Sequence, residues 1–163
     1  MRQYSVVLLD DEELILQSLQ SLIDWNGLGC YVAGTAKSGA KGKQLIQRLR
    51  PDIVITDIKM PEITGTEIAA YCARHLPRTR VIILSAYADF SFAQSALRSK
   101  TVAYLLKPID KKELTDAVRH AADEYRQMEN SLASREQEQA DMENARTLAT
   151  ASLLFNLARY GVS

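Results

Sequence analysis

Short apolar runs alternate with longer amphipathic stretches along the chain up to residue 110. The short runs have the length of strands and are rich in β-branched or aromatic residues. Their nearly unbroken apolarity predicts strands that are buried on both faces, as in parallel sheets. The predicted strands are Ser5–Leu9, Cys30–Thr35, Ile53–Thr56, Val81–Leu84 and Val102–Leu106. The stretches between them carry apolar residues at helical spacing, so the pattern predicts a (βα)5 doubly wound α/β fold with a parallel five-stranded sheet.

Residues that begin or interrupt helices agree with this division. Thr64–Glu67 and Asp110–Glu113 have the sequence of capping boxes, and Asp89 can cap a fourth helix that begins near Phe90. All prolines fall between predicted elements, where a missing backbone N–H does no harm: Pro51, Pro61, Pro77 and Pro108. The predicted helices therefore have defined starting points.

The region after the fifth strand has a different character. No glycine or proline occurs from Lys111 to Tyr160, which predicts a helix longer than a compact domain ordinarily holds. A heptad-like apolar seam runs from Leu114 to Leu132, fails over Ser134–Asp141, and is followed by a dense apolar cluster at Leu153–Leu157. Two interpretations fit this region: a final helix packed on the sheet with a solvated extension, or a dimeric coiled coil.

Composition narrows the functional classes. Twenty basic and twenty acidic side chains in 163 residues cancel, which argues against a surface that itself binds nucleic acid or anionic membrane. Cys30 and Cys72 are too far apart for a metal knuckle or a disulfide framework, and we expect both to be buried, as in a reducing compartment. The sequence has no signal peptide and no apolar stretch long enough to span a membrane, so we expect a cytoplasmic protein.

Residues able to carry chemistry stand at the ends of the predicted strands. These residues are Asp10 and Asp11 after the first strand, Asp57 after the third, Ser85 after the fourth and Lys107 after the fifth. In a doubly wound sheet, ligands bind beyond the carboxyl ends of the strands. Each residue alone has an ordinary explanation as a helix cap, a turn residue or a surface charge. Their joint position at one edge of the sheet is harder to explain as coincidence.

Three carboxylates at one edge require a counter-charge. Two like charges ~4 Å apart repel by about 4 kcal/mol at an effective dielectric constant of about 20, and Lys107 offsets only part of this repulsion. A hard divalent cation such as Mg²⁺ completes the balance. A metal ion and an ammonium group can shield the oxygens of a phosphoryl group while a carboxylate attacks phosphorus. The pattern therefore predicts a phosphoryl-transfer site in which the protein itself is the acceptor.

These residues lie in motifs that resemble the receiver domain of two-component response regulators. The motifs are Asp10-Asp11, Asp57-Ile-Lys-Met-Pro61, Ser85-Ala86 and Tyr104-Leu-Leu-Lys-Pro108. The resemblance covers residues 4–125 and implies a flavodoxin-like sheet with strand order 2-1-3-4-5. It also implies a signalling domain, not an enzyme acting on other substrates, whose only chemistry is its own phosphorylation and dephosphorylation.

The resemblance further implies a role for each residue at this edge. Asp57 would be the phosphoacceptor, and Mg²⁺ would be held by Asp10, Asp11, Asp57 and the backbone carbonyl of Lys59. Ser85 would bind the oxygens of the phosphoryl group, and Lys107 would pair with the phosphate. Ala86 would leave phosphorus accessible, and Tyr104 would be the aromatic switch. The Lys107–Pro108 peptide bond would be cis.

Further motifs are similar to regulators of the AraC/YesN type, in which a receiver and a helical linker precede a DNA-binding domain. They are Ile23-Asp-Trp25, Ser85–Phe90 and the Tyr-Leu-Leu-Lys-Pro run. The resemblance implies a receiver over residues 1–125 and a helical linker or coiled-coil segment over residues 126–163, leading to a DNA-binding domain absent from this chain. One departure is that many relatives carry glycine near Lys100, where this chain has Ser99-Lys-Thr101.

The implied partners are a sensor histidine kinase and a second copy of the chain. The second copy would bind through the face of the fourth helix, fifth strand and fifth helix, together with the linker. DNA would be bound only through the appended domain, and no membrane partner is expected.

Three alternatives share the fold. A receiver-like interaction module would work without phosphorylation. A phosphatase with an aspartyl-phosphate intermediate would need a second acid at position 59, where lysine stands. A flavin-binding electron carrier would need a phosphate-cradling loop after the first strand, where Asp11–Glu13 would repel phosphate.

Overall fold

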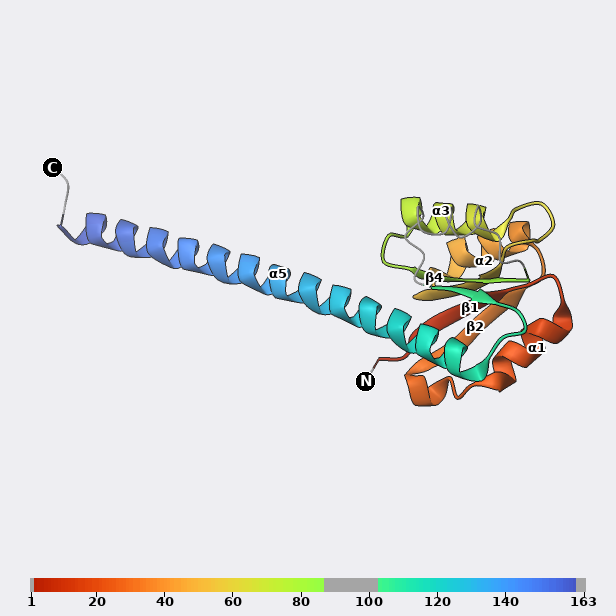
Figure 1. The fold of residues 1–163 in the computed structure, drawn as a ribbon. Coiled ribbons are helices and arrows are strands. Elements are labelled where there is room, and N and C mark those ends of the chain that lie inside the picture. Colours follow the sequence, from red (N-terminus) through yellow and green to blue (C-terminus); the bar gives the residue numbers. More distant parts are fainter. Residues whose placement is uncertain (1, 87–102, 161–163) are drawn as a thin grey trace. The chain divides into compact units, whose positions relative to one another are not determined.

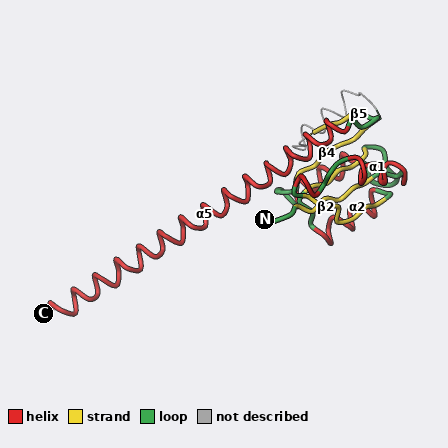
Figure 2. The backbone as a smooth tube through the Cα atoms, turned by 90° about the horizontal axis from the view of Figure 1, so that it is seen from below, coloured by secondary structure: helices red, strands yellow, loops and turns green. Residues whose placement is uncertain are grey.

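The computed structural model describes residues 2–86 and 103–160. Within this part of the chain, five parallel strands form one sheet in the order β2-β1-β3-β4-β5, with β2 and β5 at its two edges (Figure 2). The strands are β1 (Tyr4–Leu9), β2 (Cys30–Ala36), β3 (Ile53–Asp57), β4 (Arg80–Ser85) and β5 (Ala103–Leu106). The helices are α1 (Glu13–Leu22), α2 (Gly39–Leu49), α3 (Gly65–His75) and α5 (Lys111–Tyr160), with a short 3-10 turn η1 (Asn26–Leu28). The predicted doubly wound fold and its strand order are confirmed.

The predicted fourth helix cannot be compared with the structure. The cap at Asp89, the helix start near Phe90 and the Ser99–Thr101 stretch lie outside the described residues, as does the predicted first residue of β5, Val102. The other predicted strand ends lie within a single residue of the observed ones.

Each face of the sheet has its own apolar core. Successive strand residues point to opposite faces, so Val6 and Leu8 of β1 pack with α1 and the first part of α5, whereas Val7 and Leu9 pack with α2 and α3 (Figure 1). All four side chains are fully buried. The sheet is therefore covered on both faces, as the unbroken apolarity of its strands predicts.

Side-chain caps mark the starts of α3 and α5. At the start of α3, the Glu67 backbone N–H donates to the Thr64 hydroxyl at 3.2 Å, and the Thr64 N–H donates to the Glu67 carboxylate at 3.3 Å. The predicted capping box at Thr64 is therefore present. At the start of α5, the Glu113 N–H donates to the Asp110 carboxylate at 3.0 Å.

The chain divides into two compact units, Met1–Arg126 and Gln127–Ser163, and α5 contributes residues to both. In the first unit, the initial positions of the heptad-like seam are buried in the core of the domain: Leu114, Val118, Ala121 and Tyr125. Side chains already packed against the sheet cannot also pack against a second helix. The idea of a dimer seam that begins at Leu114 is therefore wrong, and only seam positions after Tyr125 are open to such a role.

In the second unit, the described residues form the continuation of α5. Several of its large apolar side chains are exposed: Met142, Leu148, Leu153, Leu154, Phe155 and Leu157. No helix in the described part of the chain is long and apolar enough to cross a membrane.

Candidate functional site

The sheet brings three carboxylates together at one edge. Asp10 and Asp11 follow β1, Asp57 is the last residue of β3, and these two strands are neighbours. One carboxylate oxygen from each of the three residues lies within 4.8 Å of the others. Asp10 is completely buried and Asp57 is 8% exposed, whereas Asp11 is exposed. The cluster is therefore open to solvent on the side of Asp11.

Lys107 brings a positive charge to this cluster. Its ammonium nitrogen Nζ lies 2.9 Å from Oδ2 of Asp10 and 3.4 Å from Oδ2 of Asp57. The backbone N–H of Lys107 donates to the carbonyl of Ser85 at 2.7 Å, and the Lys107–Pro108 peptide bond is cis. Main-chain pairing with the end of β4 thus positions the lysine over the acids.

Backbone N–H groups orient the two buried carboxylates. The N–H of Ile58 donates to Oδ1 of Asp57 at 2.9 Å, and the N–H of Glu12 donates to Oδ1 of Asp10 at 3.0 Å. In each residue, the second oxygen is the one that approaches Lys107. Each carboxylate is therefore held in one orientation by its own loop.

The environment shifts the pKa values of two of these groups. Burial raises the pKa of the Asp57 carboxyl; the nearby Asp10 carboxylate adds to the rise, and Lys107 opposes it. Burial alone would lower the pKa of Lys107, but its hydrogen bond to Asp10 and its attraction to both acids outweigh burial and raise that pKa. The environment therefore favours the protonated, charged form of Lys107 and disfavours the ionised form of Asp57.

The remaining predicted residues belong to β4 and β5 or lie just after β3 and β4. Ser85 is completely buried at the end of β4, and the adjacent Ala86 is exposed. Tyr104 of β5 is half-buried and packs against the core on the α2 and α3 side. The side chain of Lys59 is exposed.

Sequence reasoning missed Gly65. A Cβ atom at this position would collide with the backbone carbonyl oxygen of Asp57 and would lie 3.0 Å from Cα of Ile58. The N–H of Gly65 also donates to the Ile58 carbonyl at 2.8 Å. The first turn of α3 can therefore lie directly on the backbone of Asp57 only because residue 65 lacks a side chain. The signal in the sequence was a glycine directly after the helix cap Thr64.

The donor set fits a hard divalent cation. Three carboxylates against a single ammonium leave an excess of negative charge, and their oxygens are close enough to bind one ion together. Magnesium in proteins takes one or two carboxylates with further oxygen ligands and waters. The exposed position of Asp11 leaves room for such waters.

The fold and this edge together define a class of protein. A doubly wound sheet in the order β2-β1-β3-β4-β5, with acids directly after β1 and at the end of β3 and a lysine after β5, is the arrangement of a receiver domain. The response regulator receiver domain family matches residues 6–119, and the chain belongs to that family.

Individual relatives agree with this assignment. The transcriptional regulatory protein YesN of Bacillus subtilis is 33% identical over 115 residues, which are 71% of this chain and 31% of YesN. The transcriptional regulatory protein HptR of Staphylococcus aureus is 37% identical over 135 residues, which are 80% of this chain and 53% of HptR. The chain therefore spans between about a third and about a half of the length of these curated relatives.

Solved receiver domains have the same fold. The REC domain of AraT, a response regulator of Geobacillus stearothermophilus, superposes with a TM-score of 0.70 at 32% identity, over 79% of this chain and 98% of that domain. The receiver domain of NarL from Mycobacterium tuberculosis superposes with a TM-score of 0.69 at 28% identity, over 76% of this chain and 98% of that domain.

Proposed function

We propose that Asp57 accepts a phosphoryl group from a phosphohistidine of a sensor histidine kinase. The observation that carries this proposal is the position of Asp57 Oδ2, 3.4 Å from the Lys107 ammonium, in a cluster with Asp10 and Asp11. A carboxylate oxygen in this place is a nucleophile held beside positive charge, with its other oxygen fixed by the Ile58 N–H. The protein would thus be the acceptor, as a signalling domain requires.

The reaction exchanges one bond to phosphorus for another. The carboxylate oxygen Oδ2 of Asp57 forms an O–P bond while the N–P bond to the kinase histidine breaks, and the leaving imidazole nitrogen takes up a proton from water. Lys107 attracts the phosphoryl oxygens as they approach. Ser85 at the end of β4 would donate its hydroxyl to a phosphoryl oxygen, and Ala86, which is small, would leave phosphorus accessible. Later attack by water on the same phosphorus would break the O–P bond, release inorganic phosphate and return Asp57 to its free carboxylate.

Asp10, Asp11 and Asp57, with the backbone carbonyl of Lys59, would hold Mg²⁺. When bound, the cation supplies charge shielding between the acids and the incoming phosphoryl group. Asp10 also keeps Lys107 close to Asp57 through their 2.9 Å contact. The acids would therefore position both Mg²⁺ and the Lys107 ammonium, although only Asp57 would be phosphorylated.

Phosphorylation would shift an equilibrium between two states of the domain. An aspartyl phosphate adds negative charge and acceptor oxygens, and a change from 1:99 to 99:1 between two states needs about 5.5 kcal/mol of differential stabilisation. Lys107 and Ser85 can supply part of it by moving toward the phosphoryl group. Tyr104, which is half-buried on β5, would then turn inward as the aromatic switch.

The output would be dimerisation and control of transcription in the cytoplasm. Residues 1–125 would act as the receiver and residues 126–163 as a helical linker to a DNA-binding domain. The dimer would use the face that contains β5 and the first turns of α5, together with linker positions after Tyr125. Support comes from YesN and HptR, both named transcriptional regulatory proteins, of which this chain matches only part.

Incubation with acetyl phosphate and Mg²⁺ tests the acceptor. Intact-mass spectrometry should show one added phosphoryl group on the wild-type chain and none on Asp57→Asn. Asp116→Asn, which changes an exposed aspartate of α5, is the matched control and should be phosphorylated normally. Phosphorylation of Asp57→Asn would overturn the assignment. If the wild type takes up no phosphoryl group from acetyl phosphate or from histidine kinases, the chain is an interaction module that works without phosphorylation.

A further inference from the structure

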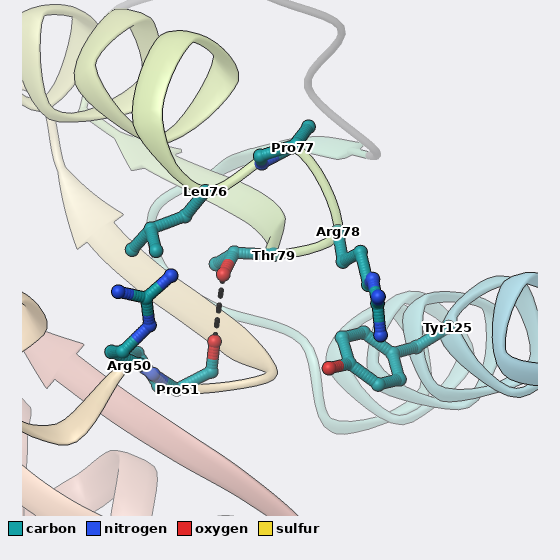
Figure 3. A pocket seen from close by; sticks show the side chains of 7 residues that line it. All are labelled: Arg50, Pro51, Leu76, Pro77, Arg78, Thr79 and Tyr125. Carbon is teal, nitrogen blue, oxygen red and sulfur yellow. Dashed lines mark hydrogen bonds between the residues drawn. The ribbon is translucent and has the colours of Figure 1, made fainter.

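A pocket lies where β3 and β4 begin, at the end of the sheet opposite the carboxylate cluster. Figure 3 shows the residues that line it. Its volume is about 330 Å³. It is lined by Arg50 and Pro51, which precede β3, by Leu76–Thr79, which precede β4, and by Tyr125 of α5. Asp57 ends β3, so the pocket and the phosphoacceptor are separated by the length of that strand. The pocket is therefore distinct from the site described above.

Two arginines give this pocket unbalanced positive charge. The charged groups around it are paired: Arg2 with Asp52 at 2.9 Å, and Arg80 with Glu124 at 3.6 Å. In the part of the chain that the structure describes, no carboxylate forms an ion pair with Arg50 or Arg78. Figure 3 shows these two side chains on opposite sides of the hydrogen bond from the Thr79 hydroxyl to the Pro51 carbonyl. The pocket thus has a guanidinium group on each of two sides and no acid in its lining.

The backbone of Arg50 adds an independent observation. Arg50 is the C-cap of α2 and has a left-handed conformation, with φ 46° and ψ 62°. Glycine or asparagine fits this position with less strain. Arg50 adopts this unfavourable conformation and also lines the pocket, which suggests that its side chain has a role besides ending α2.

The walls of the pocket are already fixed. The Thr79 hydroxyl donates to the Pro51 carbonyl at 2.7 Å, which joins the two turns that form the floor. The ring of Tyr125 packs edge-on against the ring of Tyr4, with centroids 5.5 Å apart. The lining therefore combines two exposed arginines with the apolar surfaces of Leu76, Pro77 and Tyr125.

We propose that this pocket binds a small organic dianion, of the phosphate monoester or dicarboxylate class. The guanidinium groups of Arg50 and Arg78 would bind the anionic groups, since arginine donates paired N–H groups to phosphate and carboxylate oxygens. Leu76, Pro77 and the ring of Tyr125 would contact the apolar part of the ligand. A ligand here touches α5 through Tyr125, close to Arg126, where the first compact unit ends. The site goes beyond the proposed phosphoacceptor function and does not depend on it.

The test is an NMR titration of the whole chain with phenyl phosphate and, separately, with succinate. The buffer is free of Mg²⁺ and of chelators, because a chelator is itself a polyanion and metal would promote binding at Asp57. We expect saturable shifts at the backbone amides of Leu76, Arg78 and Thr79, with an affinity that falls as salt rises. Binding of one probe alone identifies the ligand class, and binding of either supports the site.

Arg50→Gln and Arg78→Gln should each weaken binding by about tenfold or more, because each removes a charge-assisted contact. Arg48→Gln is the matched control: it changes an arginine of α2 that lines a different pocket with Lys41, and it should leave the affinity unchanged. Urea unfolding of each variant shows whether it is folded. Weaker binding by either folded arginine variant is enough to support the site. The proposal is overturned if neither probe gives saturable shifts, if both arginine variants bind normally, or if the shifts map to Lys41 or to Asp57.

Discussion

Nζ of Lys107 donates a hydrogen bond to Oδ2 of Asp10 at 2.9 Å, across 97 positions of the chain. The two residues follow β5 and β1, which are separated in the sheet by β3 and β4. Because Asp10 is completely buried, its carboxylate would be costly without this partner. The same ammonium lies farther from Asp57, at 3.4 Å. A phosphoryl group on Asp57 would therefore compete with Asp10 for Lys107.

Burial of the Asp57 carboxylate predicts that Asp57→Asn stabilises the metal-free protein. The pKa of Asp57 is raised in the folded state, chiefly by burial. Proton binding by Asp57 therefore stabilises the folded state. This stabilisation is fully present below the ordinary pKa of aspartate and is lost as pH rises through the raised pKa of the folded state. At neutral pH the ionised carboxylate opposes folding, and asparagine removes this cost, so we expect the variant to have a higher free energy of unfolding than the wild type.

Urea unfolding of both proteins without Mg²⁺, from about pH 4 to about pH 7, measures this difference. The advantage of Asp57→Asn should grow as pH rises over this range. Added Mg²⁺ should stabilise the wild type and reduce the difference, since a ligand of the folded state favours folding. A variant less stable than the wild type at every pH would contradict the assigned cause of the pKa shift.

Removal of the exposed acid should separate metal binding from stability. Asp11→Asn is expected to weaken Mg²⁺ binding by about tenfold or more, because it removes one of few charged oxygen ligands. Its effect on stability should be small, since Asp11 is exposed. Calorimetric titration with MgCl₂ measures the affinity. Glu12→Gln, which removes the adjacent exposed carboxylate, should bind Mg²⁺ as the wild type does; equal losses in both variants would indicate a non-specific charge effect.

Gly65→Ala should be among the most damaging single-methyl substitutions in the domain. The new Cβ would meet the rigid backbone of Asp57 and Ile58, so α3 must move, and we expect a loss of about 2 kcal/mol in the free energy of unfolding. Phosphorylation of Asp57 by acetyl phosphate should slow as well. Gly27→Ala is the control, because its Cβ meets only the Asp24 side chain, which can move aside. Thermal and urea unfolding of both variants checks the contrast.

The two cysteines should be unreactive while the protein is folded. Both thiols are free and buried, and burial raises the pKa of Cys30 to about 11 and that of Cys72 to about 12. Thiolate is the reactive form, so modification at mildly alkaline pH should be at least about a hundredfold slower than in urea. A colorimetric thiol assay in native and denaturing buffer measures the two rates. Rapid modification of one thiol in native buffer would show that its surroundings open readily.

Much of the fold follows from local pattern. The unbroken apolar runs at Ile53–Thr56 and Val81–Leu84 identify buried parallel strands, because only strands covered on both faces can be apolar at every position. Thr64 and Glu67 identify the start of α3, because a capping box is formed by residues three positions apart. The candidate site could be predicted for the same reason: its acids stand directly at strand ends, and parallel strands end at one edge.

Other features could not be read from local pattern. An apolar stripe that begins at Leu114 looks the same whether the helix packs on its own sheet or on a second helix, and only the burial of Leu114 and Val118 decided between the two at these positions. Gly65 could not be recognised as a contact of Asp57, because α3 meets the end of β3 only in the folded chain.

The order of residues alone determined that this chain forms alternating strands and helices, and that acids stand after the first and third strands. Those properties depend on neighbours within a few positions. Tertiary structure decided which acid Lys107 contacts more closely, that burial raises the pKa of Asp57, and that Arg50 and Arg78 line one pocket. These properties depend on distance and solvent exclusion between residues far apart in the sequence, which exist only after the sheet has assembled.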